Sequence, residues 1–196
     1  MRITEAKKVL STFISNQFPL PAAETEAFLQ EWELITIKRK QLITKAGDTE
    51  KYLYFVLEGV QRCFYIGSDK QEATLIFTYP YSFSGVADSL LTQTPSNYFM
   101  ETLSTSTFLR TPHQRLAALT KEYPLIQSFV LQLTAMALKG VLERQIELQC
   151  FSAEEKFKTL LKRSPHVLNL IPHKYLASYL GLDATTFSKL LGKVKL

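Results

Sequence analysis

Hydroxyl groups and a positive charge come together near the end of the sequence, at Thr185, Thr186, Ser188 and Lys189. If Asp183 caps a helix at this point, the two threonines lie in its first turn, and Ser188 and Lys189 follow on the next. A recognition helix presents this end to base edges in the major groove. Since Ala184 has no hydrogen-bonding reach, we expect Lys189 to contact guanine and Thr185 to contact a base edge or a thymine methyl group.

The stretch from His173 to Leu191 has the spacing of a helix-turn-helix, in which two helices cross over a short turn. Ala177 is small where the helix axes meet, and Gly181 can take the left-handed conformation that ends the first helix. The apolar positions of the two helices should share one small core: Leu176, Leu180, Phe187 and Leu190. A helical hairpin that packs without binding DNA has the same spacing and is the alternative.

The distribution of charge favours a polyanionic partner. Residues 1–150 hold 15 Lys and Arg against 15 Asp and Glu, whereas residues 151–196 hold 8 against 3, which accounts for the whole net charge of +5. Charge needed only for solubility could be spread over the chain, so this concentration indicates double-stranded DNA. Four residues lie where they could contact phosphates, which adds affinity without sequence information: Lys174, Tyr175, Lys193 and Lys195.

Length and composition are those of a soluble globular protein with room for two domains, since 46% of the 196 residues are hydrophobic. The sequence has no run of 18 apolar residues and no signal-peptide core at its start, so we expect a cytoplasmic protein without a membrane segment. Cys63 and Cys150 are 87 residues apart and form no C-x-x-C pair, so neither a disulfide framework nor a cysteine-ligated zinc or iron–sulfur site is expected. We expect no cofactor and no metal site.

From Leu34 to Thr111 the sequence alternates with period two, which is typical of short antiparallel strands in a sandwich or barrel. The predicted strands are 34–37, 41–44, 52–57, 60–66, 73–78, 98–103 and 107–110. Two amphipathic helices at 3–17 and 22–32 come first, separated by a segment with prolines at 19 and 21.

Pro112 opens a helical region that is broken at Pro124, and one helix of about 25 residues then runs from about Leu125 to Gln149. Its broad apolar stripe can be covered by the β domain: Leu125, Ile126, Phe129, Val130, Leu133, Met136, Ala137 and Val141. Its narrow stripe resembles a coiled-coil seam and predicts a homodimer: Leu131, Ala135, Leu138, Leu142 and Ile146. Burial of the helix within one monomer is the alternative.

The order of these elements resembles the Crp/Fnr family of bacterial transcription regulators over essentially the whole chain. Residues 45–48 with 52–59 are similar to the family's glycine-turn and tyrosine-strand motif, and Phe83–Leu90 stands where its phosphate-binding cassette begins. Ser152–Glu155 forms a capping box after the hinge, and the final stretch matches the family's reading head. The tail resembles the I-P-x-x-Y-x-A-S-Y-L-G pattern of Bacteroidetes-like regulators.

The resemblance implies an α+β protein with three parts. An N-terminal antiparallel β-roll, similar to a cyclic nucleotide-binding domain, would sense an effector with its flanking helices (1–117). A long dimerisation helix (118–150) would lead to a helix-turn-helix DNA-binding domain (151–196), with no room before Leu196 for the wing of many relatives. RNA polymerase and an unknown small-molecule effector are the further partners that the resemblance implies.

The sequence departs from the family pattern at the effector pocket. Members that bind cyclic AMP hold the ribose with a glutamate and the phosphate with an arginine, and Val86 and Ser96 stand at these positions here. Without the arginine fork a cyclic phosphate would meet no fixed positive charge, so we expect no cyclic AMP binding. The pocket is either vestigial or takes a less anionic effector through residues of the cassette: Gly85, Val86, Ala87, Ser96, Asn97 and Tyr98. The cysteine cluster of the oxygen-sensing branch is absent, which argues against an iron–sulfur sensor.

No catalytic constellation accompanies these motifs. His113, His166 and His173 are scattered, and Asp88, Glu72 and Glu101 match no catalytic motif, so we do not expect an enzyme. The sequence therefore predicts a dimeric DNA-binding regulator with an unidentified effector. A ligand-binding or interaction protein of the same fold, with weak or lost DNA binding, is the alternative.

Overall fold

The computed structural model describes residues 1–193, which fall into two compact units. One unit comprises residues 1–63 and 77–136, and the other comprises residues 64–76 together with the chain from residue 137 onward. The second unit therefore joins a hairpin from the sheet region to the C-terminal helices.

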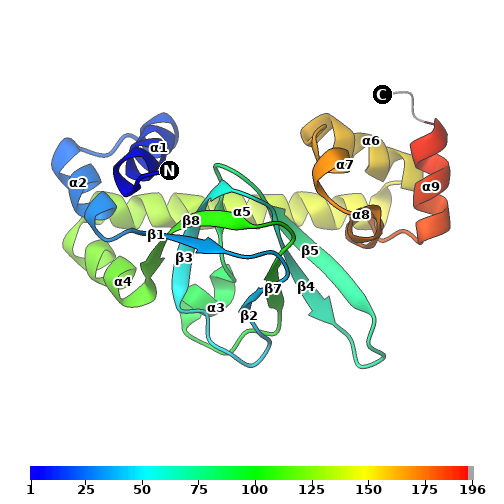
Figure 1. Cartoon of the computed structure of the whole chain (residues 1–196), viewed down its shortest axis with the longest axis horizontal. Helices are drawn as coiled ribbons and strands as arrows, with labels where there is room; N and C mark the ends of the chain where they lie inside the picture. Colours follow the sequence, from blue (N-terminus) through cyan, green and yellow to red (C-terminus); the bar gives the residue numbers. More distant parts are fainter. Residues whose placement is uncertain (194–196) are drawn as a thin grey trace. The chain divides into compact units, whose positions relative to one another are not determined.

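The first unit begins with two helices, α1 (Ile3–Gln17) and α2 (Ala22–Gln30), as the sequence predicted (Figure 1). The carboxylate of Glu5 accepts a hydrogen bond from the Arg2 amide at 3.0 Å and so satisfies a free donor at the start of α1. Helix α2 ends two residues earlier than expected, because the chain turns at Glu31 into the first strand.

Eight strands run through the described residues and form two four-stranded sheets in the orders β1-β8-β3-β6 and β2-β7-β4-β5. The strands are β1 Glu33–Ile37, β2 Leu42–Thr44, β3 Tyr52–Glu58, β4 Gln61–Ile66, β5 Glu72–Thr78, β6 Phe83–Ser84, β7 Phe99–Thr102 and β8 Ser106–Pro112. All seven predicted strands are present, and the predicted antiparallel β-roll is confirmed by pairs such as β1 with β8. Strand β6 was not predicted, because two residues are too few to show alternation.

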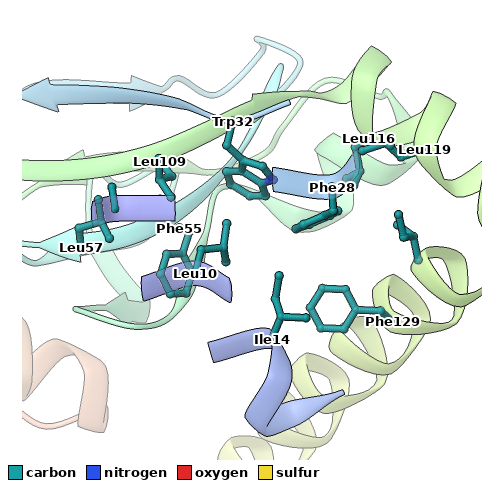
Figure 2. Close-up of a cluster of buried hydrophobic side chains, with 12 residues drawn as sticks. Leu10, Ile14, Phe28, Trp32, Phe55, Leu57, Leu109, Leu116, Leu119 and Phe129 are labelled. Atoms are coloured by element: carbon teal, nitrogen blue, oxygen red, sulfur yellow. The ribbon is translucent and has the colours of Figure 1, made fainter. Parts of the chain in front are cut away.

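Figure 2 shows the main core of the first unit, where aromatic and aliphatic side chains from helices and strands meet. Phe28 and Trp32 pack ring against ring at 5.4 Å, and Phe28 contacts Phe129 edge-on at 5.9 Å. Phe55 from β3 and Leu109 from β8 complete the cluster beneath α1. Burial of these large side chains is what fixes the N-terminal helices to the sheet.

Three helices follow or interrupt the sheet: α3 (Ala87–Thr92), α4 (His113–Glu122) and α5 (Pro124–Cys150). The expected start of the dimerisation segment at residue 118 does not coincide with the long helix, because residues 118–122 belong to α4. Helix α5 begins at Pro124, whose ring fits a first helical position.

Opposite faces of α5 differ in burial. Ile126 and Phe129 of the broad stripe are buried in the first unit, whereas Met136 and Val141 of the same stripe are exposed. The narrow stripe is exposed throughout, with 69% of Leu131 and 59% of Leu138 accessible. Burial of this stripe within one monomer is therefore not observed in the described residues.

Four C-terminal helices belong to the second unit: α6 (Ala153–Arg163), α7 (Val167–Leu170), α8 (His173–Leu180) and α9 (Ala184–Lys193). The predicted capping box is present, since the Glu155 amide donates to Ser152 Oγ at 3.3 Å and the Ser152 amide donates to Glu155 Oε2 at 2.8 Å. The single-turn helix α7 was not predicted.

Gly59 turns the chain between β3 and β4 with a φ of +90°. A Cβ atom there would lie 2.6 Å from the carbonyl oxygen of Thr105 and 2.7 Å from the Cα of Ser106, which are backbone atoms. We expect Gly59→Ala to lower the free energy of unfolding by about 2–5 kcal/mol, because left-handed strain of about 1–2 kcal/mol adds to overpacking of about 1–3 kcal/mol. Equilibrium denaturation in urea measures the loss.

Gly47 supplies the matched control, because its φ is +91° and no described atom lies within 4 Å of a Cβ added there. Gly47→Ala should show the strain alone, about 1–2 kcal/mol. Equal losses in the two variants would contradict the role of close backbone approach at Gly59.

Candidate nucleic-acid interface and effector pocket

The two helices of the predicted helix-turn-helix pack as their spacing required. The four predicted core positions are buried, and so is Ala177 where the helices cross: Leu176, Leu180, Phe187 and Leu190. The ring of Phe187 meets Phe157 of α6 edge-on at 5.4 Å and lies 5.6 Å from the ring of His173. Apolar side chains therefore fill the space between α6, α8 and α9, and the polar faces of these helices point to solvent.

Gly181 and Asp183 define the turn between α8 and α9. Gly181 has a φ of +63°, the left-handed value that ends α8, and the Leu182 amide donates to the Ala177 carbonyl at 2.9 Å. The Asp183 carboxylate accepts from the Thr186 amide at 2.9 Å and from the Thr186 hydroxyl at 2.7 Å. These bonds, the hydroxyl first, lower the pKa of Asp183, so the cap stays charged and favours the start of α9.

Thr185, Ser188 and Lys189 are exposed on α9 and recur at three and four residues, so they share one face of the helix. The hydroxyl of Thr186 is held by Asp183 instead, so Thr186 contributes to the cap. Hydroxyl and ammonium groups on one exposed helix face can donate to acceptors on base edges.

Side chains suited to phosphate lie on both helices. Lys174 and Lys193 are exposed, and the Lys174 ammonium lies 4.6 Å from the centre of the half-buried Tyr175 ring. The predicted phosphate contact Lys195 lies outside the described residues.

The predicted effector pocket lies in the first unit around the start of α3. Gly85 has a φ of +115°, and Val86 is buried in an apolar cluster with Cys63 and Met100. Ala87 and Asn97 are exposed, and Tyr98 packs against the same cluster. Val86 thus fills apolar space and offers no carboxylate to a ribose.

Ser96 is buried and its hydroxyl is already used within the loop. Its Oγ donates to the Tyr98 carbonyl at 2.9 Å and accepts from the Tyr98 amide at 2.9 Å. Backbone bonds to Gly47 and Asp48 hold the same residue in place. Ser96 therefore shapes the loop and offers no positive charge to a phosphate.

Glu50 was not predicted, yet its buried carboxylate lies at this pocket. It accepts from the amides of Lys51 at 2.9 Å and Val86 at 3.3 Å, and the hydroxyl of Thr44 donates to it as well. The Val86 amide at the start of α3 therefore already donates to a carboxylate of the same chain, that of Glu50. A cyclic phosphate placed beside this carboxylate would meet like-charge repulsion.

Cys63 lies in the same apolar cluster as Val86. Burial, together with the negative charges of Asp88 and Glu50, raises the pKa of the Cys63 thiol to about 12. Within the described residues, no three His, Cys, Asp or Glu side chains gather to hold a metal ion.

Sequence reasoning also missed the buried polar contacts of the second unit. Ser178 Oγ accepts from the Thr74 amide at 2.9 Å and donates to the Glu72 carbonyl at 3.1 Å, so α8 contacts the edge strand β5. Arg144 and Glu147 of α5 are buried as well. Nothing in the spacing of these residues distinguishes them from charges and hydroxyls on a solvated helix.

Comparison with known proteins agrees with this architecture. A model of the cyclic nucleotide-binding domain matches residues 34–123. The anaerobic regulatory protein of Pasteurella multocida is 25% identical over 170 residues, which is 81% of this chain and 62% of that protein. The fumarate and nitrate reduction regulatory protein of Vibrio cholerae is 26% identical over 194 residues, which is 91% of this chain and 77% of that protein. The chain thus spans less than two thirds of the Pasteurella protein.

Solved structures share the fold. FixK2 from Bradyrhizobium japonicum aligns with a TM-score of 0.74 at 16% identity, covering 83% of each chain. A Crp/Fnr transcriptional regulator from Eubacterium rectale aligns with a TM-score of 0.71 at 15% identity, covering 92% of this chain and 86% of the other. Residues 34–123 thus match the cyclic nucleotide-binding domain, and the chain resembles Crp/Fnr regulators in sequence and shares their fold.

Proposed function

We propose that the protein is a dimeric, cytoplasmic transcription regulator that binds double-stranded DNA through α9 and is not an enzyme. The observation that carries this proposal is the exposed face of Thr185, Ser188 and Lys189 on a helix whose opposite face is closed against α6 and α8. Lys189 reads guanine and Thr185 reads a base edge or a thymine methyl group. Lys174, Tyr175, Lys193 and Lys195 meet phosphates, and RNA polymerase is a further partner.

Lys189→Ala should weaken binding to the preferred duplex by about 1–3 kcal/mol and relax the preference at one base pair, because a base contact is lost. Lys193→Ala is the matched control, since it should weaken all duplexes alike and lower the salt slope by about one for each protomer. Footprinting and titration of both variants on a site selected by the wild type measure the difference. Unchanged affinity and preference in Lys189→Ala would rule out α9 as the reader.

The dimer in this proposal forms along the narrow stripe of α5. By length and composition α5 is also the one helix in the described residues that could cross a membrane. Lys139, Glu143 and Arg144 would then carry charge into the bilayer at high cost. A second copy covers the apolar stripe and leaves these charges outside the seam, so we favour a two-fold homodimer. Its recognition helices would lie about 34–36 Å apart and bind an inverted repeat.

Leu138→Glu should convert the dimer into a monomer, because a carboxylate would be buried in the apolar seam. Gln132→Glu adds the same charge to an exposed position of α5 beside the stripe and should remain dimeric. Light scattering coupled to size-exclusion chromatography distinguishes the two masses. A monomeric wild type would refute the seam.

The β-roll in this proposal responds to an unidentified effector other than cyclic AMP, or to none. Three observations support this: Val86 fills apolar space, Ser96 is held in its own loop, and Glu50 directs a carboxylate at the start of α3. A less anionic ligand would use Asn97, Tyr98 and backbone amides near Gly85. An interaction protein that has lost DNA binding would keep this pocket and fail the duplex titration.

Isothermal calorimetry with cyclic AMP should give no binding at micromolar concentrations, because like charge meets the phosphate at Glu50. Adenosine, which has the same base and sugar without the anion, is the control ligand. Saturable micromolar binding of cyclic AMP by the wild type would contradict the proposed role of Val86 and Ser96.

A further inference from the structure

One face of α5 changes character along its length. Ile126 and Phe129 make this face apolar in the first unit, and steps of three and four residues lead from Phe129 to Arg144 and Glu147. In the second unit the buried positions of the face are therefore an ion pair, with 8% of Arg144 and 5% of Glu147 exposed.

The ion pair extends into a cluster that joins three helices. Glu147 accepts from Arg144 Nη1 at 2.6 Å and from Arg163 Nη1 of α6 at 2.9 Å. Arg144 Nη2 donates to the carbonyl of Tyr179 in α8, and the guanidinium lies 4.2 Å from the centre of the Tyr179 ring. Arg163 Nη2 donates to the Tyr179 hydroxyl at 3.4 Å.

This cluster is a costly way to hold helices together. Buried charges lose hydration that their mutual attraction only partly restores, and apolar residues of similar volume often stabilise a protein as well or better. The buried Arg144 Nε also has no hydrogen-bond partner among the described residues. What a planar guanidinium adds is direction, since its donors fix the angle of each bond.

The same helix α8 is held a second time at the preceding residue. Ser178 bonds to the amide of Thr74 and the carbonyl of Glu72, two outward groups of the edge strand β5. Successive residues of α8 thus contact different elements, which fixes the rotation of the helix about its axis as well as its position. Helix α9 follows α8 after a three-residue turn, so the position and rotation of α8 also determine where α9 lies.

We propose that Arg144, Glu147 and Arg163 are positioning residues that set the orientation of the recognition helix relative to α5. This inference rests on the proposed function, since in a dimer built along α5 the orientation fixes the separation of the two α9 helices. The cluster then determines which half-site spacing the protein accepts, whereas Lys189 and Thr185 determine which bases it reads.

The experiment uses duplexes that carry two copies of the selected half-site with the natural spacing or with two added base pairs. Wild type should prefer the natural spacing about tenfold or more, and Glu147→Gln should reduce this preference to about threefold or less. Glu143→Gln is the matched control, because Glu143 lies one turn away on α5 and is exposed. A wild-type spacing preference in Glu147→Gln would overturn the proposal.

A second variant separates positioning from stability. This triple variant replaces the three charged side chains by apolar ones of similar volume, which should preserve folding: Arg144→Met, Glu147→Leu and Arg163→Met. We expect this triple variant to melt at or above the wild-type temperature and still lose the spacing preference. A folded triple variant that keeps the wild-type preference would show that the cluster only fills space.

A third measurement needs no DNA. Two spin labels are attached, at Gln145→Cys on α5 and at Ser188→Cys on α9, in a protein that also carries Cys150→Ser. Dilution with unlabelled protein leaves one labelled protomer in most dimers, so the measured distance is that between the two helices within one protomer. The distribution should be narrow with the intact cluster and broader in both cluster variants. If the wild type bound no duplex, the proposed function would fail, and equal widths in all variants would independently overturn the positioning role.

Discussion

Helix α5 has faces that need different partners, and the rest of the architecture depends on how each is covered. Its first half buries Ile126 and Phe129 against the helices and sheet of the first unit, and its second half buries Arg144 and Glu147 against α6 and α8. The remaining stripe around Leu138 stays exposed in the single chain. Since exposed apolar surface of this length is unfavourable in water, a second copy of α5 is the partner that the stripe fits best.

The β-roll keeps the frame of a cyclic nucleotide-binding domain while its pocket has different chemistry. Gly85 has a left-handed backbone conformation beside the start of α3, the carboxylate of Glu50 accepts a hydrogen bond from the Val86 amide, and the Val86 side chain is buried in an apolar cluster. The Val86 amide at the start of α3 already has a hydrogen-bond acceptor in Glu50, so the fold does not need a bound anion there. The match to this domain therefore predicts the fold of the unit more reliably than its ligand, because the ligand depends on a few side chains.

The parts of the structure that could be predicted from sequence are those with a repeated physical signal. Leu176 and Phe187 repeat at helical spacing, and the strands alternate over several residues, so both patterns were read correctly. Glu50 and Glu147 gave no such signal, because a lone carboxylate in a turn or on a helix has the same letters whether it is solvated or buried. Only the packing around them decides, and this depends on residues distant in the sequence. The two-residue strand β6 is too short to form a pattern.

In the proposed function, the exposed face of α9 and its neighbouring lysines bind duplex DNA, with one such face from each protomer of a dimer. The most direct test is the dependence of wild-type binding on salt, measured by fluorescence anisotropy with a labelled duplex of mixed sequence. Phosphate contacts by Lys174, Lys193 and Lys195 from two protomers would neutralise about six phosphates and give a slope of log K against log salt of about −5. A slope near zero, or no binding at low salt, would contradict the account.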